Sequence, residues 1–165
     1  MQLEKIFSGL GLAKSTTELV TLLFVMIAIS AIFWVFVGRF RLHNFLINTY
    51  IAYALLAVLP SDLFAGNKYF QAMVFFVFLI VLTLMNRFLF DIHQNGSGLA
   101  LWQVFVMSFL EVGLILSIVL VFIPEKEVLK YLSKDAIFYF VSLWARLVWM
   151  SLPLVFLIFV NKRNR

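Results

Sequence analysis

The sequence predicts an all-α protein, a polytopic integral membrane bundle of about five transmembrane helices joined by short loops. Hydrophobic residues make up 64% of its 165 residues and charged residues only 13%. The mean hydropathy is +1.06, whereas soluble domains are closer to half apolar and a quarter charged. Apolar runs recur at the length of about 20 residues that a helix needs to cross ~30 Å of hydrocarbon. These features exclude a soluble fold and predict a single membrane domain over residues 1–165.

Short polar segments separate the predicted spans. The first span follows a capping box, in which Ser15 precedes Glu18, and it lacks a signal-peptide cleavage site, so we expect it to stay in the membrane. The second contains Asn44, Asn48 and Ala52 on one face, which favours contact with other helices. It is either a full span or a re-entrant or interfacial helix. The spans cover about residues 17–38, 43–60, 70–90, 99–123 and 136–160.

Two short amphipathic helices are expected on the membrane surface, near residues 2–12 and 125–134, where apolar residues recur at helical spacing beside lysines. The number of positive residues does not determine which way the five spans are oriented, because the loops and tails on the two sides of the membrane carry the same number of them. Arg39 and Arg41 directly follow the first span, and positive charge near span ends favours the cytoplasm. We therefore expect the N-terminus outside and the C-terminus inside.

Two charged residues lie inside long apolar runs. Glu111 is at the midpoint of residues 99–123, and Arg146 lies near the middle of residues 136–160. A charge at the bilayer centre costs at least ~2.5 kcal/mol, so such residues face the bundle interior and usually have a partner. In an antiparallel hairpin the two side chains are offset by about three residues, or roughly 4.5 Å. The sequence thus predicts an intramembrane polar pair of Glu111 and Arg146.

Further polar residues share a helical face with one of these charges. Ser108 is expected beside Glu111, and Tyr139 and Ser142 are expected beside Arg146. Three interpretations stay open. The charges form a buried ion pair that fixes helix register, or a functional polar site for a proton, an ion or a small ligand, or they are not buried as a pair.

The opposite face of the fourth span carries small residues. Gly113 and Ser117 are four residues apart and therefore lie on one side of the helix. Small residues at this spacing let helix backbones approach closely in membranes. We expect another helix to pack there.

The sequence lacks the residues that disulfides, metal sites and common catalytic mechanisms require. The chain has no cysteine, which removes disulfides, thiolate metal sites and cysteine nucleophiles. His43 and His93 lie on separate segments, with Asp91 near the second, and so lack the spacing of a metal-binding helix. We expect no catalytic residue, no cofactor and no metal, and hence no enzyme. The terminal NKRNR favours lipid headgroups over nucleic acid.

Residues 70–123 contain two long apolar segments joined by the glycine-bearing turn HQNGSG. Over this region the chain resembles the colicin V production protein family of small bacterial inner-membrane proteins. It departs from that family at Phe109 to Gly113, which reads FLEVG where an arginine-glycine pattern is usual. The C-terminal LPLVFLIFVNKRNR also resembles a rod-shape membrane protein family, without its acidic motif. Either resemblance implies a non-enzymatic envelope protein of a bacterial inner membrane.

These features predict a non-enzymatic integral membrane protein that acts through partners in envelope assembly or secretion. The alternative is a small transporter or channel subunit that uses Glu111 and Arg146. A dry contact between these residues favours the first function, and a water-lined cavity favours the second. The expected partners are the lipid bilayer and other membrane proteins, not nucleic acid, and a homo-oligomer is a further alternative.

Overall fold

The structure, a computed structural model, describes residues 14–37, 42–64, 67–89, 100–130 and 132–163. Within these ranges the regular elements are helices and no strand occurs, which confirms the all-α class. The surface helix predicted near residues 2–12 and the turn HQNGSG lie outside the described residues. The elements are α2 (Lys14–Val37), α3 (Leu42–Val58), η1 (Ser61–Phe64), α4 (Lys68–Leu89), α5 (Leu101–Phe122), α6 (Glu125–Val128), α7 (Lys134–Val141) and α8 (Leu143–Arg163).

The first four predicted spans correspond to α2, α3, α4 and α5, with ends that differ from the prediction by at most three residues. Among the residues that the structure describes, two helical segments are long and apolar enough to cross a membrane, judged by length and composition. They are Leu101–Phe122, which is α5, and Leu143–Val160 in α8. Shorter apolar segments occur in the other three long helices, at Val20–Phe33, Leu42–Val58 and Tyr69–Met85.

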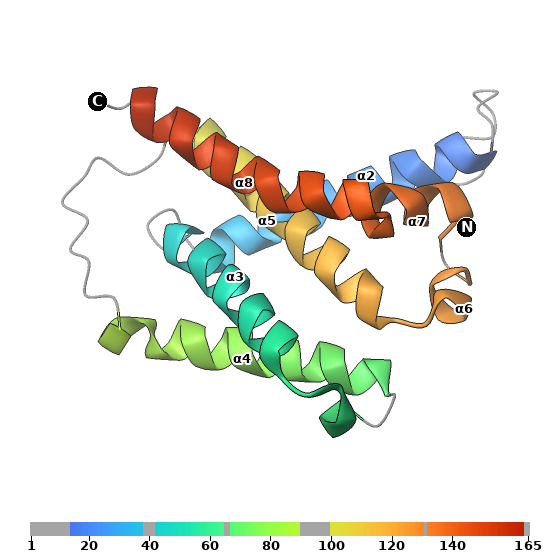
Figure 1. The fold of residues 1–165 in the computed structure, drawn as a ribbon. Helices are drawn as coiled ribbons and strands as arrows, with labels where there is room; N and C mark the ends of the chain where they lie inside the picture. The colour runs from blue at the N-terminus through green and yellow to red at the C-terminus, as the bar shows by residue number, and fades with distance from the viewer. Residues whose placement is uncertain (1–13, 38–41, 65–66, 90–99, 131, 164–165) are drawn as a thin grey trace.

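Helix α5 is the centre of the arrangement (Figure 1). It packs against α2, α3, α4, α7 and α8, and α3 packs in addition along α4. Apolar residues occupy all sides of α5, so the helix has no polar face to turn outward. Of the residues in its most apolar 18-residue stretch, 56% are buried by the rest of the chain. In Figure 1, α8 crosses α5 on one side, whereas α3 and α4 lie on the other.

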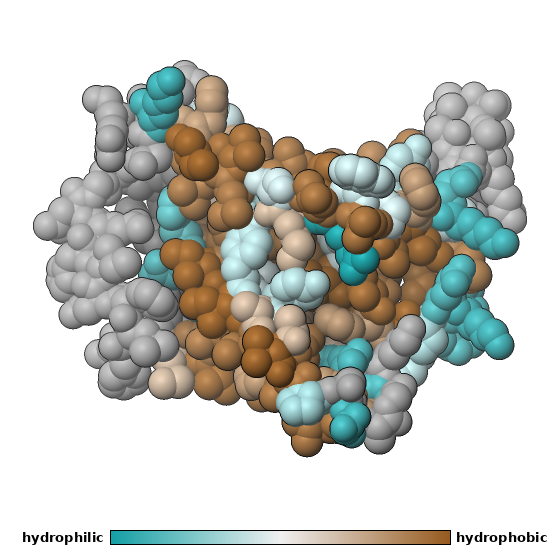
Figure 2. All heavy atoms as spheres, viewed as in Figure 1, coloured by the Kyte–Doolittle hydropathy of each residue, from teal (hydrophilic) through white to brown (hydrophobic). Residues whose placement is uncertain are grey.

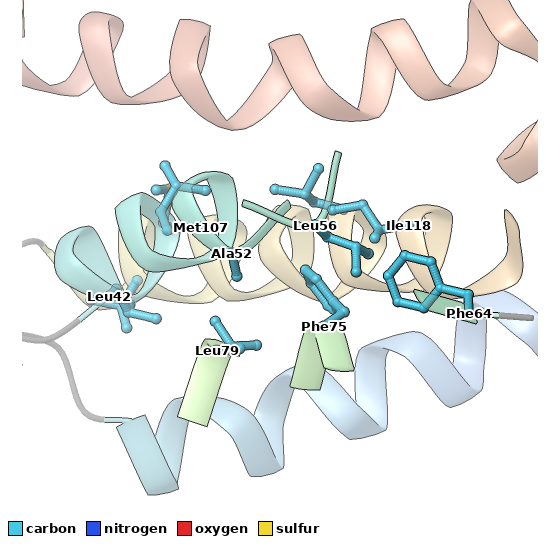
Figure 3. Packing of buried hydrophobic residues seen from close by; sticks show 11 residues of the cluster. Leu42, Ala52, Leu56, Phe64, Phe75, Leu79, Met107 and Ile118 are labelled. Carbon is cyan, nitrogen blue, oxygen red and sulfur yellow. The ribbon is translucent and has the colours of Figure 1, made fainter. Parts of the chain in front are cut away.

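The larger apolar core lies between α3, α4 and α5 (Figure 3). Phe75 and Leu79 are one turn apart on α4 and point together toward α3, where Ala52 is fully buried. Asn48, one turn before Ala52, is also fully buried, which confirms that this face of α3 meets other helices. The buried members of the core are Leu42, Leu46, Ala52, Leu56, Phe64, Phe75, Leu79, Val104, Met107, Leu114 and Ile118.

A smaller core joins α2, the end of α5, α6 and α7. The surface helix predicted near residues 125–134 is only a single turn, α6, which ends at Val128, a buried member of this core. Lys130 then forms an ion pair with Glu127 at 2.8 Å. Ser133 is extended, and its hydroxyl accepts a hydrogen bond from the amide of Ala136, which starts α7. The buried members are Met26, Leu120, Val128 and Phe140.

The apolar stretch of residues 136–160 is not one helix, which corrects the predicted fifth span. It is divided into α7 and α8 at Ser142, where the backbone is extended with φ −58° and ψ 152°. The Ser142 hydroxyl accepts a hydrogen bond of 3.2 Å from the amide of Ala145 and so caps the first turn of α8. A serine hydroxyl can compete for backbone amides in this way, and a hydropathy pattern does not register that capacity.

The outer surface of the bundle is largely apolar. Figure 2 shows hydrophobic atoms over most of one face, with a smaller group of hydrophilic atoms near its middle. Helix α8 is far more exposed than α5: only 11% of the residues of Leu143–Val160 are buried, and Leu143 and Trp144 are 71% and 75% exposed. Apolar surface of this extent indicates contact with lipid or with another protein.

Candidate functional site

Trp149 of α8 is seated on Gly113 of α5. The indole ring lies so close to Gly113 that an added Cβ would be only 2.5 Å from Cε3 of the ring. The ring also stacks on Phe140 of α7, with centroids 5.2 Å apart and planes inclined by 11°. The expected close approach at the Gly113 face of α5 is therefore confirmed, and the helix that makes it is α8.

Side chains satisfy the backbone where α7 ends. The last carbonyls of a helix have no partner inside it, and a buried carbonyl without a hydrogen bond is costly. The Ser117 hydroxyl donates to the carbonyl of Phe140 at 2.7 Å, and the Trp149 indole N–H donates to the carbonyl of Tyr139 at 3.1 Å. Neighbouring side chains can support a broken helix inside a membrane in this way. We call Gly113, Ser117 and Trp149 the helix seat, because they hold α7 and α8 on α5.

Glu111 points away from the helix seat. Two residues advance a helix by about 200°, so Glu111 and Gly113 lie on opposite faces of α5. Because α7 and α8 occupy the face of Gly113 and Ser117, the carboxyl group is directed toward the other helices.

The Glu111 carboxyl group is buried without a polar partner. Its side chain is 1% exposed, and neither oxygen has a hydrogen bond. Ser108, one turn earlier on the same face, is fully buried with an unpartnered hydroxyl, and both amide atoms of Asn48 on α3 are in the same condition. A buried polar group without a hydrogen bond costs about 1–3 kcal/mol, and an isolated charge costs far more. An ionisable side chain buried in an apolar helical bundle is therefore a candidate functional group.

The structure does not join Glu111 to Arg146, which corrects the predicted contact. Arg146 is half-buried on α8, and its Nε is buried without a hydrogen-bond partner. Among the described residues an ion pair links Lys130 to Glu127, and none links Glu111 to Arg146. Trp149 meets α5 at Gly113 and α8 runs antiparallel to α5, so Arg146 lies about five residues, or roughly 7.5 Å, from Glu111 along the helix axis. This offset and the rotation of α5 together separate the two residues.

The residues expected to support the pair are not gathered in one place. Ser108 shares the buried face of Glu111, as predicted. Tyr139 has an exposed side chain and contributes only its backbone carbonyl, to Trp149. The hydroxyl of Ser142 is engaged in capping α8. Only Ser108 therefore accompanies Glu111 in the interior.

Tyr50 joins α3 to α8, a role that the sequence did not reveal. Its hydroxyl donates a hydrogen bond to the carbonyl of Met150. Pro153 lies inside α8 and has no amide hydrogen, so this turn of the helix lacks one of its own hydrogen bonds. An interior proline in an apolar helix often has polar groups from neighbouring helices beside it. The carbonyl that loses its donor to Pro153 is that of Trp149, four residues earlier, so the bond from Tyr50 is made to the next carbonyl along the helix.

Comparison with known proteins gives no relative on which to base a function. No protein-family model, curated protein or solved structure matches the chain. Within the described residues, no group of three or more metal-ligating side chains comes together. The resemblance to the colicin V production protein family stays a prediction from sequence.

Proposed function

We propose that the chain is a small, non-enzymatic membrane protein that acts by binding other membrane proteins. The observation that carries this proposal is the outer surface of α8. This helix is long and apolar enough to span a bilayer, and only 11% of the residues of Leu143–Val160 are buried by the rest of the chain. It nevertheless carries Arg146, which has no hydrogen bond or ion pair to any other described residue. Its Nε is buried without a hydrogen bond, and a charge at membrane depth usually has a partner, which another protein can supply.

In this proposal all five apolar segments cross the inner membrane of a bacterium, with the N-terminus outside and the C-terminus inside. Helices α2 and α4 support it, because each exposes large apolar side chains such as Phe24 and Leu84. Burying a side chain of this size is worth about 1.5–3 kcal/mol, so these surfaces are far better suited to lipid than to water. Envelope assembly or secretion is the process that the sequence resemblance implies.

A second function is favoured by a different observation, the unpartnered carboxyl group of Glu111. A buried acid with an unpartnered Ser108 one turn away is the kind of group that transporters and channels use to carry a proton or bind a cation. The broken α7–α8 segment points the same way, since interrupted helices are common in transporters. In this alternative the chain is a small transporter or channel subunit centred on Glu111.

Reconstituted liposomes distinguish the two functions. The full chain is placed in liposomes that contain a pH-sensitive dye, and proton and cation flux is measured under an imposed gradient. A partner-binding protein gives no flux above that of empty liposomes. A transporter gives a flux that Glu111→Gln abolishes and that Ser30→Ala leaves intact, because the buried Ser30 hydroxyl already bonds its own helix at Met26.

Site-specific photo-crosslinking tests the partner-binding function directly. A photo-reactive amino acid replaces Leu147, which is exposed on α8, and the matched control replaces Leu84, which is exposed on α4. In cells that express the natural partners, we expect a discrete protein adduct from Leu147 that is lost when Arg146 is also changed to Leu. The proposal is contradicted if the two positions give protein adducts in equal yield. It is also contradicted if both positions crosslink only to lipid.

A further inference from the structure

We infer that the cavity between the end of α5, α6 and α7 binds one phospholipid with a zwitterionic headgroup, phosphatidylethanolamine. In this arrangement an acyl chain lies in the cavity, the ammonium group of the lipid meets Glu125 and its phosphate meets Lys134. The inference rests on the membrane location in the proposed function, and it adds a ligand that partner binding does not require.

The cavity has the size of a small-molecule site. Its volume is about 400 Å³, within the range of roughly 300–1,000 Å³ that is usual for ligand pockets. Helix α5 contributes the apolar side chains of Leu120, Val121 and Ile123 to its wall. Phe138 of α7 also lines the cavity and is 66% exposed, so the cavity reaches the surface of the bundle.

Helix α7 gives the cavity a charged end and an apolar end. Its lining residues recur at the spacing of one helical face, and they are Lys134, Ile137, Phe138 and Val141. Lys134 is the first residue of α7, and Val141, the last, lies about 10 Å farther along the helix axis. A site that is charged at one end and apolar over the rest of its length fits an amphiphile.

The charged end lies at the level where a bilayer has its headgroups. The hydrogen bond from Ser117 of α5 to the carbonyl of Phe140 in α7 sets the two helices at one depth. From this bond α5 runs five residues to its end at Phe122, and α7 runs six residues back to its start at Lys134. Glu125, just past the end of α5, and Lys134 are therefore at the boundary of a helix that is long enough to span the hydrocarbon.

The charges at this end select the headgroup. Glu125 and Lys134 are both exposed, and no ion pair joins either of them to another described residue. A phosphatidylethanolamine headgroup has a phosphate for the lysine and a primary ammonium whose N–H groups a carboxylate accepts. Phosphatidylcholine has no N–H donor for Glu125, and phosphatidylglycerol has no cationic group. A zwitterionic lipid with a primary amine is the occupant that engages both charges.

Photo-crosslinking in lipid nanodiscs tests the inference. The full chain is inserted into nanodiscs that contain equal amounts of phosphatidylethanolamine, phosphatidylcholine and phosphatidylglycerol with identical acyl chains. A diazirine-bearing amino acid replaces Ile137, which is half-buried and lines the cavity. The matched control carries it at Leu147, which is exposed on α8 and is not part of the cavity wall. Mass spectrometry identifies the headgroup of each lipid adduct.

We expect adducts at Ile137 to contain phosphatidylethanolamine about threefold more often than phosphatidylcholine, a ratio that one exposed charge interaction can supply. Adducts at Leu147 should follow the proportions of the mixture. Circular dichroism in the same nanodiscs shows whether the helices of each variant are intact.

Two charge substitutions assign the headgroup contacts. Glu125→Gln should remove the preference over phosphatidylcholine, and Lys134→Gln should lower the yield of phosphatidylethanolamine adducts at least about threefold. The matched controls are Glu127→Gln and Lys126→Gln, since these residues belong to the same segment but do not line the cavity. Both controls should keep the yield and the preference of the unchanged chain.

Four results overturn the inference. Adducts at Ile137 in the proportions of the mixture show that the cavity selects no headgroup, and a preference that survives both charge substitutions shows that Glu125 and Lys134 do not make it. A preference for phosphatidylglycerol makes the occupant an anionic lipid. Adducts with residues 1–13 or with a second copy of the chain make the occupant a protein segment. A chain that fails to insert into the nanodiscs contradicts the proposed function itself, whereas insertion without headgroup selection overturns only this inference.

Discussion

Trp149 of α8 rests on Gly113 of α5, and this contact determines the direction of the Glu111 carboxyl group. With the indole ring against one face of α5, the opposite face turns Glu111 toward the interior. The same contact leaves Arg146 half-buried on α8, where its Nε has no hydrogen-bond partner. The separation of the two charges is thus a consequence of where one ring packs.

Gly113→Ala should lower the free energy of unfolding by about 1–3 kcal/mol, because the new methyl group collides with the Trp149 ring. Alanine is the better helix former by up to about 1 kcal/mol, so a net loss of stability shows that the collision dominates. Chemical unfolding in detergent measures the difference. Trp149→Phe removes the ring atoms nearest Gly113, and so Gly113→Ala should cost less in that background. An equal cost in both backgrounds would mean that the ring is not seated on Gly113.

Ser117→Ala should destabilise the fold by about 1–3 kcal/mol, since it leaves the buried carbonyl of Phe140 without its donor. Ser30→Ala is the matched control. The Ser30 hydroxyl is equally buried, but it bonds the carbonyl of Met26 within its own helix. We therefore expect the control to lose less stability than Ser117→Ala. If the two variants unfold alike, the end of α7 does not depend on Ser117.

Tyr50→Phe should cost about 0.5–1.5 kcal/mol, the net value of one hydrogen bond, because the aromatic ring stays in place and only the bond to Met150 is lost. Tyr53→Phe, at a half-buried position of the same helix, is the control for removal of a tyrosine hydroxyl. Thermal unfolding of the two variants should place Tyr50→Phe below Tyr53→Phe. Identical unfolding temperatures would argue against the link between α3 and α8.

Much of the fold follows from hydropathy and turn chemistry. The apolar runs predict α2, α3, α4 and α5, because in a chain with few charges each run has nearly the same bounds as the helix that it forms. The break at Ser142 does not follow, since one serine within an apolar run barely changes hydropathy although it can cap a helix.

The candidate site was predicted only in part. The depth of Glu111 and Arg146 can be read from position along the chain, but their mutual orientation depends on which face of α5 receives α8. The sequence carried that signal in Gly113 and Ser117, because small residues mark the face where another helix approaches. A face marked in this way implies that Glu111, on the other side, does not meet the helix that packs there. The role of Tyr50 depends on three-dimensional packing between α3 and α8, and sequence spacing does not encode it.

The most direct test of the separation of the two charges is a double-mutant cycle on Glu111 and Arg146, with unfolding free energies measured in one detergent. The structure predicts that Glu111→Leu alone is neutral or stabilising, because it removes a buried polar group that has no partner. It also predicts that the changes in unfolding free energy caused by Glu111→Leu and by Arg146→Leu sum, to within about 0.5 kcal/mol, to the change in the double variant. The account is contradicted if each single substitution costs about 3–5 kcal/mol and the double variant recovers most of that loss, the behaviour of a buried ion pair.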